Sequence, residues 1–156
     1  MNNKVSIITP CYNGARYIGE TIESVLAQDY TDWEMIIVND GSSDNSEEVV
    51  NAYVQKDQRI RLINQKNGGS ANARNHGIRE ASGRYICLLD ADDLWYPSFL
   101  SEQLAFMNEK GAAVVCSSYE HINADSEVFG RVDECMPVIT TRDMYVMNRI
   151  GCLTGL

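Results

Sequence analysis

Two kinds of segment alternate along the first 110 residues of the chain. Short runs of consecutive apolar residues predict buried β-strands, and longer segments with apolar residues three or four positions apart predict amphipathic helices. The predicted strands are 5–9, 33–39, 60–63 and 85–89, and the predicted helices are 16–28, a segment from Asp44 through Val54, 71–82 and 98–110. Strands that alternate with helices at short intervals form mostly parallel sheets with right-handed crossovers. The pattern therefore predicts an α/β fold.

The hydrophobic pattern is weaker beyond residue 110. It predicts a strand at 112–116, a hairpin of 119–122 with 128–132 around the turn 123–127, a last helix from Thr140 or Thr141 to about Arg149, and the beginning of another strand at 151–156. Because that final segment does not resemble the last element of a domain, we expect the chain to be a piece of a longer protein.

Residues with special backbone chemistry mark several of the predicted element ends. Pro10 cannot donate a backbone hydrogen bond and is expected to end the first strand. Asp44, with Glu47 three residues later, predicts a capping box at a helix start. Ser70 is expected to cap the helix that follows it, and Gly111 is expected to end the helix that precedes it.

Three carboxylates follow the predicted strand 85–89, which we expect to be a central strand of the sheet: Asp90, Asp92 and Asp93. Open α/β sheets hold their ligands at this end of their strands, and carboxylates packed so closely repel one another. A divalent cation such as Mg²⁺ or Mn²⁺ would relieve this repulsion. The alternative is a solvated turn in which Asp93 or Ser98 caps the next helix. We favour metal and ligand binding for Asp90 and Asp92, and the cap for Asp93.

Other polar and aromatic residues near predicted strand ends are candidates for ligand binding. Asp40 follows a strand and is either an Asx-turn residue or an acceptor for a base or ribose. Arg74 can hold a diphosphate or pair with the aspartates. Tyr12 is either a residue at the core edge or a flat surface for a ligand ring. His76 is expected to be a packing or surface residue rather than a catalyst.

The composition restricts the class of ligand. The chain has 156 residues, 44% of them hydrophobic, which is typical of one globular domain. Its net charge of −9 argues against nucleic-acid binding, which needs a basic surface. An anionic ligand would need local compensation by a metal, an arginine or helix N-termini. Neither G-x-G-x-x-G nor a phosphate loop ending in Gly-Lys-Ser/Thr follows the first strand.

Two features of the sequence bear on where in the cell the protein is expected: its cysteines and its lack of long apolar runs. The five cysteines are an odd number without a C-x-x-C pair, which favours reduced thiols in a cytoplasmic protein. No run of about 18 apolar residues occurs, so we expect no transmembrane segment in this chain. Peripheral association with the inner face of a membrane is compatible with these observations.

Four motifs in this order resemble the N-terminal half of a family 2 glycosyltransferase with the GT-A fold: V-S-I-I-T-P-C-Y-N, V-N-D-G-S-S-D, N-G-G-S-A-N-A-R-N-H-G and L-L-D-A-D-D. Each stands at a predicted strand end or helix start, and together they cover residues 5 to about 100. The resemblance implies a Rossmann-like, mostly parallel sheet flanked by helices. It also implies that residues 1–156 are a nucleotide-sugar-binding domain without the acceptor-binding part.

The resemblance implies roles for the residues near the base of the donor. By matching position, Pro10 and Tyr12 line the base pocket, and Asp40 accepts a hydrogen bond from the base. Arg74 lies beside the base or the phosphates. The donor of such enzymes is a nucleotide sugar, usually a UDP-sugar.

The resemblance also identifies Asp90-Ala91-Asp92 as the D-x-D element. It implies that Asp90 lies near the ribose and that Asp92 holds Mn²⁺ or Mg²⁺ against the diphosphate. Such a metal acts as a Lewis acid on the departing nucleoside diphosphate.

The family resemblance implies inverting transfer to a glycan or lipid-linked acceptor in polysaccharide or cell-envelope biosynthesis, with an acidic general base. That base usually lies beyond the segment matching Cys152–Leu156, and none of 125, 127, 133 or 134 occupies a matching position. We therefore assign no base and expect this chain to bind a UDP-sugar but to transfer sugar poorly. The alternative is a non-catalytic nucleotide-sugar-binding module. A nucleotidyltransferase is disfavoured because no glycine- and lysine-rich loop follows the first strand.

Overall fold

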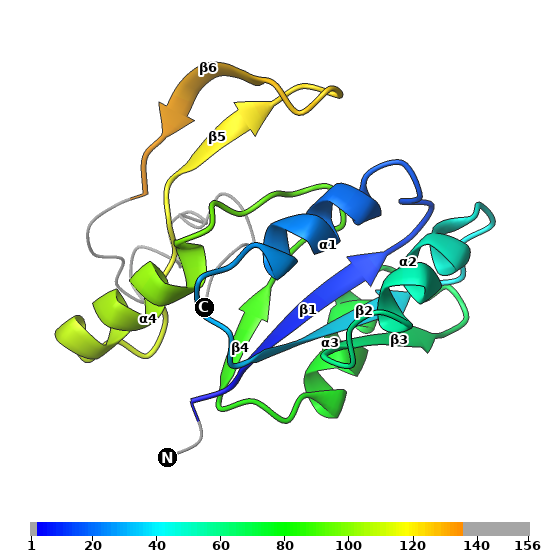
Figure 1. Ribbon diagram of the computed structural model, residues 1–156, viewed down its shortest axis with the longest axis horizontal. Helices are drawn as coiled ribbons and strands as arrows, with labels where there is room; N and C mark the ends of the chain where they lie inside the picture. The colour runs from blue at the N-terminus through cyan, green and yellow to red at the C-terminus, as the bar shows by residue number, and fades with distance from the viewer. Residues whose placement is uncertain (1–2, 136–156) are drawn as a thin grey trace.

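Residues 3–135 are described by the computed structural model of the protein (Figure 1). In chain order the elements are β1 (Val5–Cys11), α1 (Ile18–Leu26), β2 (Trp33–Asn39), α2 (Ser46–Val54), β3 (Ile60–Asn64), α3 (Ser70–Glu80), β4 (Tyr85–Leu88), α4 (Phe99–Lys110), β5 (Tyr119–Ile122) and β6 (Val128–Asp133). The first four strands form one parallel sheet in the order β3-β2-β1-β4, and β5 and β6 form a separate antiparallel hairpin. The predicted α/β fold with a mostly parallel sheet is confirmed.

The position of β4 in the sheet differs from the prediction. Within the described residues β1 and β2 are the central strands, and β4 is an outer strand that pairs with β1 from Val5↔Tyr85 onward. All residues of β2 are buried, whereas Tyr85, Ile86 and Leu88 are only half-buried. A run of apolar residues shows that the faces of a strand are covered, but it does not show whether both edges have a neighbour.

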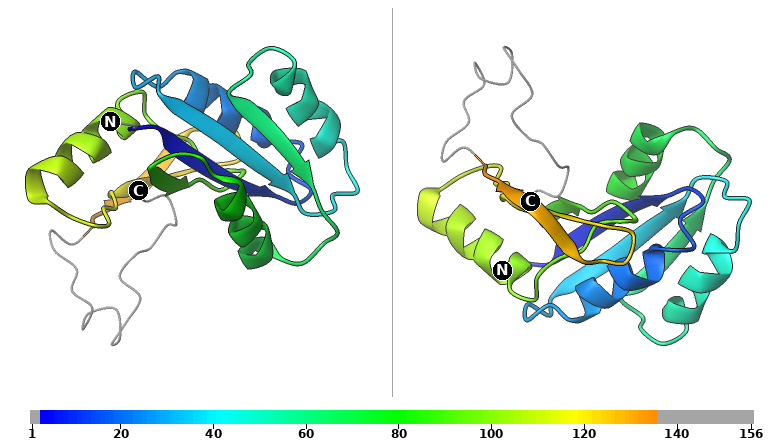
Figure 2. Two further views of the ribbon diagram at one scale, coloured as in Figure 1. Left: turned by 90° about the horizontal axis from the view of Figure 1, so that it is seen from below. Right: turned by 90° about the horizontal axis from the view of Figure 1, so that it is seen from above.

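Helices cover both faces of the sheet, so that the domain has three layers (Figures 1 and 2). On one face, Ile18 and Ile22 of α1 and Val50 of α2 belong to the same hydrophobic core as Ile7 of β1. On the other face, Ala73 of α3 packs with residues of β1 and β2. The alternation of side chains along β1 and β2 thus supplies two separate cores. No helix of the described part combines the length and the apolar character needed to cross a bilayer.

Three predicted element ends need correction. The strand β1 continues past Pro10, which lies opposite Val38, because proline loses only its donor while its carbonyl and the next residue can still pair. The predicted capping box is absent, since Glu47 Oε1 accepts a hydrogen bond from Asn64 Nδ2 at 2.7 Å instead of turning back. The residue before α3 is Gly69, and Ser70 is already helical without a capping side-chain bond.

The C-terminal part of the described chain agrees partly with the prediction. The helix α4 ends where Gly111 takes a left-handed conformation with φ of 61°, as predicted. The hairpin of β5 and β6 is also confirmed. Residues 112–116 do not form the predicted strand, because only Cys116 makes an isolated bridge. The predicted elements at 140–149 and 151–156 lie outside the described residues.

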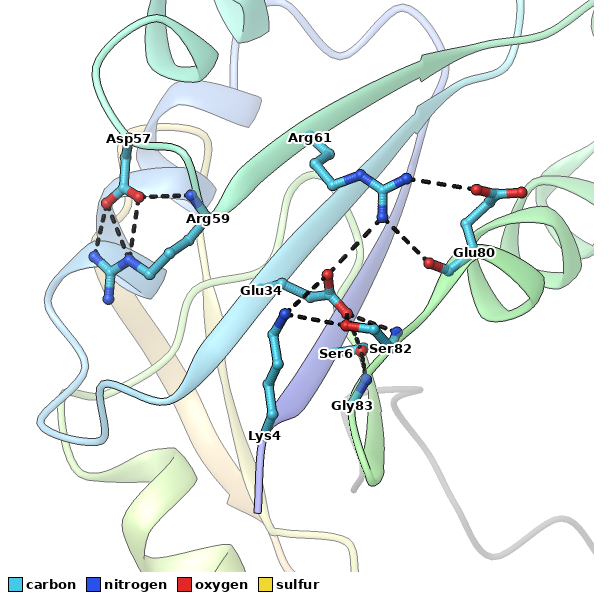
Figure 3. Close-up of polar contacts among 9 residues, drawn as sticks. All are labelled: Lys4, Ser6, Glu34, Asp57, Arg59, Arg61, Glu80, Ser82 and Gly83. Atoms are coloured by element: carbon cyan, nitrogen blue, oxygen red, sulfur yellow. Dashed lines mark hydrogen bonds and ion pairs between the residues drawn. The ribbon is translucent and has the colours of Figure 1, made fainter. Parts of the chain in front are cut away.

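A buried carboxylate ties the amino-terminal ends of the central strands together (Figure 3). Glu34 of β2 is 5% exposed, and Ser6 Oγ of β1 donates to it at 2.6 Å. The backbone N–H of Ser82 donates at 2.7 Å, and Lys4 Nζ lies 3.2 Å away. Burial alone would raise the pKa of Glu34, but the hydrogen bonds from Ser6, Ser82 and Lys4 lower this pKa to about 2. This end of the sheet is therefore held by a charged, hydrogen-bonded group.

Replacing Glu34 with glutamine is expected to destabilise the protein by about 2 kcal/mol near neutral pH, because hydrogen bonds to a charged group are lost. The folded pKa of about 2 lies below the ordinary value of 4.5, so ionised Glu34 contributes its full stabilisation above pH 4.5. That contribution is lost as the pH falls toward 2. Urea unfolding of wild type and Glu34→Gln across this pH range should show the difference shrinking below pH 4.5.

Glu109→Gln is the matched control for this measurement, because Glu109 is exposed and, within residues 3–135, its carboxylate pairs only with the neighbouring Lys110. It should leave the free energy of unfolding nearly unchanged at every pH. A difference between wild type and Glu34→Gln that stays constant down to pH 2 would show that ionisation of Glu34 does not stabilise the fold.

Candidate functional site

A pocket of about 410 Å³ opens at the carboxyl-terminal edge of the sheet, where β1 ends, β4 ends and α3 begins. The chain passes from β1 outward to β2 and β3 and returns to the other side of β1 with β4, so the strand order reverses here. Ligands of open α/β sheets bind at such a switch point. All candidate binding residues predicted from the sequence line this pocket: Pro10, Tyr12, Asp40, Arg74, Asp90, Ala91 and Asp92.

An ion pair forms one wall of the pocket. The guanidinium Nη2 of Arg74 lies 2.5 Å from Asp90 Oδ1, and the two side chains are 16% and 33% exposed. The Nε of Arg74 is buried and has no hydrogen-bond partner among the described residues. The predicted pairing of Arg74 with an aspartate is therefore confirmed. It places a cation and its counter-charge at the pocket wall.

The next two carboxylates behave differently from Asp90. Asp92 is exposed, lines the pocket, and makes no hydrogen bond or ion pair within residues 3–135. Asp93 does not cap a helix, because α4 begins only at Phe99 and its N-cap position is Ser98. Ser98 in turn makes no capping side-chain bond. The carboxylate oxygens of Asp92 are thus available to a ligand in the pocket. The prediction that Asp93 caps the next helix is wrong.

The two carboxylates at the pocket, Asp90 and Asp92, suit a cation that takes most of its ligands from a phosphate compound. Residues 3–135 contain no group of three or more His, Cys, Asp or Glu side chains placed to hold a metal. Mg²⁺ commonly binds proteins through one or two carboxylates and completes its shell with water and substrate phosphates. Asp92 alone, beside the paired Asp90, fits that mode of binding and does not fit a cage of protein ligands.

Asp40 is a buried anion among the residues that line the pocket. It is 2% exposed, and its Oδ1 accepts hydrogen bonds from Gln65 Nε2 at 2.7 Å and from the backbone of Gly68 at 2.9 Å. Its Oδ2 accepts from the backbone of Gly69 at 2.8 Å. Burial would raise the pKa of Asp40, but these three bonds lower it overall. The Asx-turn interpretation is wrong, because Asn39 Oδ1 makes the local bond to Ser42.

Two loops that sequence reasoning did not connect form the rim beside Tyr12. Asn13 has φ of 51°, and its Oδ1 accepts from the backbone of Ser43 at 2.8 Å. The backbone N–H of Gly14 donates to Ser46 Oγ at 2.9 Å. Both loops follow strands that are neighbours in the sheet, and their Asn-Gly and Ser-rich sequences are the only indication that could have paired them. The rim of the pocket is therefore cross-linked by side-chain bonds.

The remaining two candidates are also placed by the structure. Tyr12 is 57% exposed, so it is not a residue at the core edge, and its ring lines the pocket. His76 Nδ1 lies 2.7 Å from Gln65 Oε1 and outside the residues that line the pocket. The expectation that His76 is a packing residue agrees with this contact.

The model of the family described as Glycosyl transferase family 2 matches residues 6–154. The chain belongs to this family. The predicted family membership is confirmed, and with it the kind of fold in which the pocket occurs.

Curated relatives of this chain are longer than the chain itself. The chain is 38% identical over 151 residues to TuaG of Bacillus subtilis, named as a teichuronic acid biosynthesis glycosyltransferase, and covers 96% of itself and 60% of TuaG. It is 40% identical over 152 residues to WfgD of Escherichia coli, a UDP-Glc:alpha-D-GlcNAc-diphosphoundecaprenol beta-1,3-glucosyltransferase, and covers 96% of itself and 58% of WfgD. The chain therefore spans less than two thirds of the length of these relatives.

Solved structures share the fold. S. aureus TarS in complex with UDP matches with a TM-score of 0.66 and 29% identity, over 71% of this chain and 34% of TarS. The mannosyltransferase PcManGT of Pyrobaculum calidifontis, in complex with GDP-Man and Mn²⁺, matches with a TM-score of 0.70 and 25% identity, over 78% of this chain and 36% of PcManGT. Both structures carry nucleotide ligands, although with different bases.

Proposed function

We propose that this chain is the donor-binding part of a metal-dependent glycosyltransferase that takes a UDP-sugar. The observation that carries the proposal is the pocket at the strand-order reversal, which combines an exposed aromatic ring, a buried anion, an arginine and an unpaired carboxylate. A chain with net charge −9 can bind an anionic diphosphate only where positive charge is present locally. Here that charge would come from the arginine and from a cation bound by the unpaired carboxylate.

The base and phosphates of the donor would contact residues from β1, β2 and α3. The ring of Tyr12 and the neighbouring Pro10 offer flat surfaces against which a base can stack. Asp40, which lines the same pocket, would accept a hydrogen bond from a base N–H. Arg74, which pairs with Asp90, would face the diphosphate, because guanidinium groups bind phosphate oxygens well.

The segment Asp90-Ala91-Asp92 would bind the ribose and the metal. Asp90 presents one oxygen to Arg74 and can accept from a ribose hydroxyl with the other. Asp92 would hold Mn²⁺ or Mg²⁺ beside the diphosphate, and the bound ion would act as a Lewis acid for the departing nucleoside diphosphate. The support for this assignment is that Asp92 makes no competing hydrogen bond or ion pair among the described residues.

The acceptor would approach along the side of the pocket that faces the hairpin. A smaller pocket shares Tyr17 and Asp92 with the donor pocket and continues to Ile122 and Ser126. Given the relatives TuaG and WfgD, we propose that the acceptor is a glycan or a lipid-linked sugar and that transfer inverts the anomeric centre. The product would serve polysaccharide or cell-envelope biosynthesis. We further propose that the protein is cytoplasmic and acts at the inner face of the membrane. No acid in the described part is assigned as general base, so transfer by this chain alone should be slow.

Calorimetric titration of the chain with UDP, in the presence and absence of Mn²⁺, tests the proposal. We expect UDP to bind at least about tenfold more tightly with the metal, because the ion neutralises charge between Asp92 and the diphosphate. Uridine is the control ligand, because it has the base and ribose but no phosphate, and its binding should not depend on Mn²⁺. Absence of metal-dependent binding for UDP, GDP and dTDP alike would contradict the proposed function.

A further inference from the structure

Two cysteines lie in contact at the open end of the hairpin formed by β5 and β6. Cys116 Sγ and Cys135 Sγ are 2.8 Å apart, and both residues are half-buried free thiols. No sequence motif indicated this contact, because 19 positions separate the two residues. We propose that Cys116 and Cys135 are a redox-sensitive pair, which a small disulfide such as oxidised glutathione converts to an intramolecular disulfide that holds the hairpin closed.

The backbone of the hairpin brings the two thiols together. Tyr119 and Asp133 are the outermost paired residues of the two strands, and the cysteines lie just outside this pair. The two segments stay side by side there, because the backbone N–H of Cys135 donates to Ser118 Oγ at 2.9 Å. A disulfide has a sulfur–sulfur bond of about 2.05 Å, so the sulfur atoms need to approach by less than about 1 Å. The pair is therefore close to bonding distance.

The other two cysteines of the described part are shielded from oxidants. Cys11 is 1% exposed and Cys87 is 0% exposed. Burial raises the pKa of both thiols. A protonated thiol without access to solvent reacts slowly. Within residues 3–135, oxidation is therefore expected at Cys116 and Cys135.

The cross-link forms by two successive thiol–disulfide exchanges. Burial and the contact with Cys135 raise the pKa of Cys116 to about 11, so Cys116 carries little thiolate at neutral pH and the first attack falls to Cys135. The Cys135 thiolate attacks one sulfur of oxidised glutathione, which forms a mixed disulfide and releases one glutathione. Cys116 then loses its proton and attacks the Cys135 sulfur, which releases the second glutathione. The electrons and protons lost by the two cysteines are thus carried by the two glutathione thiols.

The hairpin is a part of the structure on which a cross-link can have a large effect. It does not pair with the main sheet (Figure 1), and Val128 and Phe129 are 58% and 55% exposed. Two-stranded hairpins are marginally stable by themselves, and such segments open locally. A covalent bond across the open end restricts the opened states. Because Ile122 and Ser126 line the smaller pocket beside Asp92, the bond would also hold one wall of that pocket.

Peptide mapping of the full chain after exposure to oxidised glutathione tests the proposal. Trypsin cleaves after Arg131, between the two cysteines, so the disulfide would join the otherwise separate peptides 111–131 and 132–142. We expect the free thiol at Cys116 and at Cys135 to fall at least about tenfold, with the linked peptides as the main product. Dithiothreitol should restore both thiols. Absence of the linked peptides would overturn the proposal.

Two serine variants make the peptide mapping specific. Cys116→Ser should accumulate a mixed disulfide with glutathione on Cys135, because the thiol that would displace the glutathione is absent. Cys152→Ser is the matched control, because it removes the cysteine outside the described residues and should form the cross-link as wild type does. Loss of the linked peptides in Cys152→Ser would contradict the assigned pair.

Amide hydrogen exchange measures the effect of the bond on the hairpin. In the oxidised chain, exchange of residues 119–133 should be at least about tenfold slower than in the reduced chain, while exchange of β2 stays the same. In Cys116→Ser the oxidant should not slow the exchange. Equal exchange of 119–133 in the oxidised and reduced wild-type chains would show that the bond does not hold the hairpin closed. No nucleotide takes part in these experiments, so their outcome is separate from that of the proposed function.

Discussion

Asp92→Asn is expected to reduce the affinity for UDP in the presence of Mn²⁺ at least about tenfold, to the value measured without metal. The reason is the unequal state of the two pocket carboxylates. Asp90 is already paired with Arg74, whereas Asp92 is exposed and has no partner among the described residues. The substitution therefore removes the oxygen anion that is free to bind a cation, while it preserves the size of the side chain. Calorimetric titration of both proteins with UDP, with and without Mn²⁺, measures the effect.

Asp32→Asn is the control for this prediction. Asp32 is exposed just before β2, at the opposite end of the sheet, and its substitution changes the net charge of the chain by the same amount. It should leave UDP affinity and metal dependence as in wild type. If Asp92→Asn keeps the full metal dependence of the wild-type chain, the ion is held by other residues and the role assigned to Asp92 is wrong.

Gly83→Ala is expected to lower the free energy of unfolding by about 3 kcal/mol. A Cβ atom on Gly83 would lie 2.6 Å from the backbone oxygen of Lys4 and 2.7 Å from the backbone nitrogen of Ser6. Both atoms belong to the chain around the start of β1, a central strand, and cannot move without disturbing the pairing on each side. The hydrogen bond from Gly83 N–H to Ser6 Oγ, at 2.8 Å, would also be strained. Urea unfolding followed by circular dichroism measures this loss.

Gly19→Ala provides a matched comparison within the same protein. Gly19 lies inside α1, and a Cβ atom there would be 3.6 Å from the hydroxyl of Tyr53, an ordinary van der Waals distance. Alanine is the better helix former by about 1 kcal/mol, so this variant should be as stable as wild type or slightly more stable. Equal stability of the two alanine variants would show that the backbone is not packed against Gly83 as described.

Much of the fold was predictable because the hydrophobic pattern depends on local periodicity. The strand 33–39 has the same bounds in the sequence prediction and in the structure, since all its residues are buried. The outer position of β4 was not predictable, because a strand that lacks a partner on one edge can still have both faces covered. Two helix starts were also misjudged. Glu47 bonds to Asn64, a partner that only the folded chain supplies, and the N-cap position of α3 is Gly69 rather than Ser70.

The candidate site was predictable to the extent that parallel strands end at one edge of a sheet. This rule alone brings Pro10, Asp40 and Asp90 toward the same pocket. The partners that orient these residues could not be predicted in the same way. Gln65 is 25 positions from Asp40 in the sequence, and Asn13 is 30 positions from Ser43. Contacts over such separations depend on loop conformation, for which an amino-acid pattern carries little information.

The network around Glu34 has a consequence for how this scaffold can change. The buried carboxylate of Glu34 and its hydrogen-bond partners hold the strands at one end of the sheet, and the ligand pocket lies at the other end. Substitutions around Tyr12 or Asp92 therefore leave the hydrogen-bond network of Glu34 intact. Such a division lets selection, or a protein engineer, exchange the residues of the ligand-binding end for those of another specificity while the same framework continues to fold.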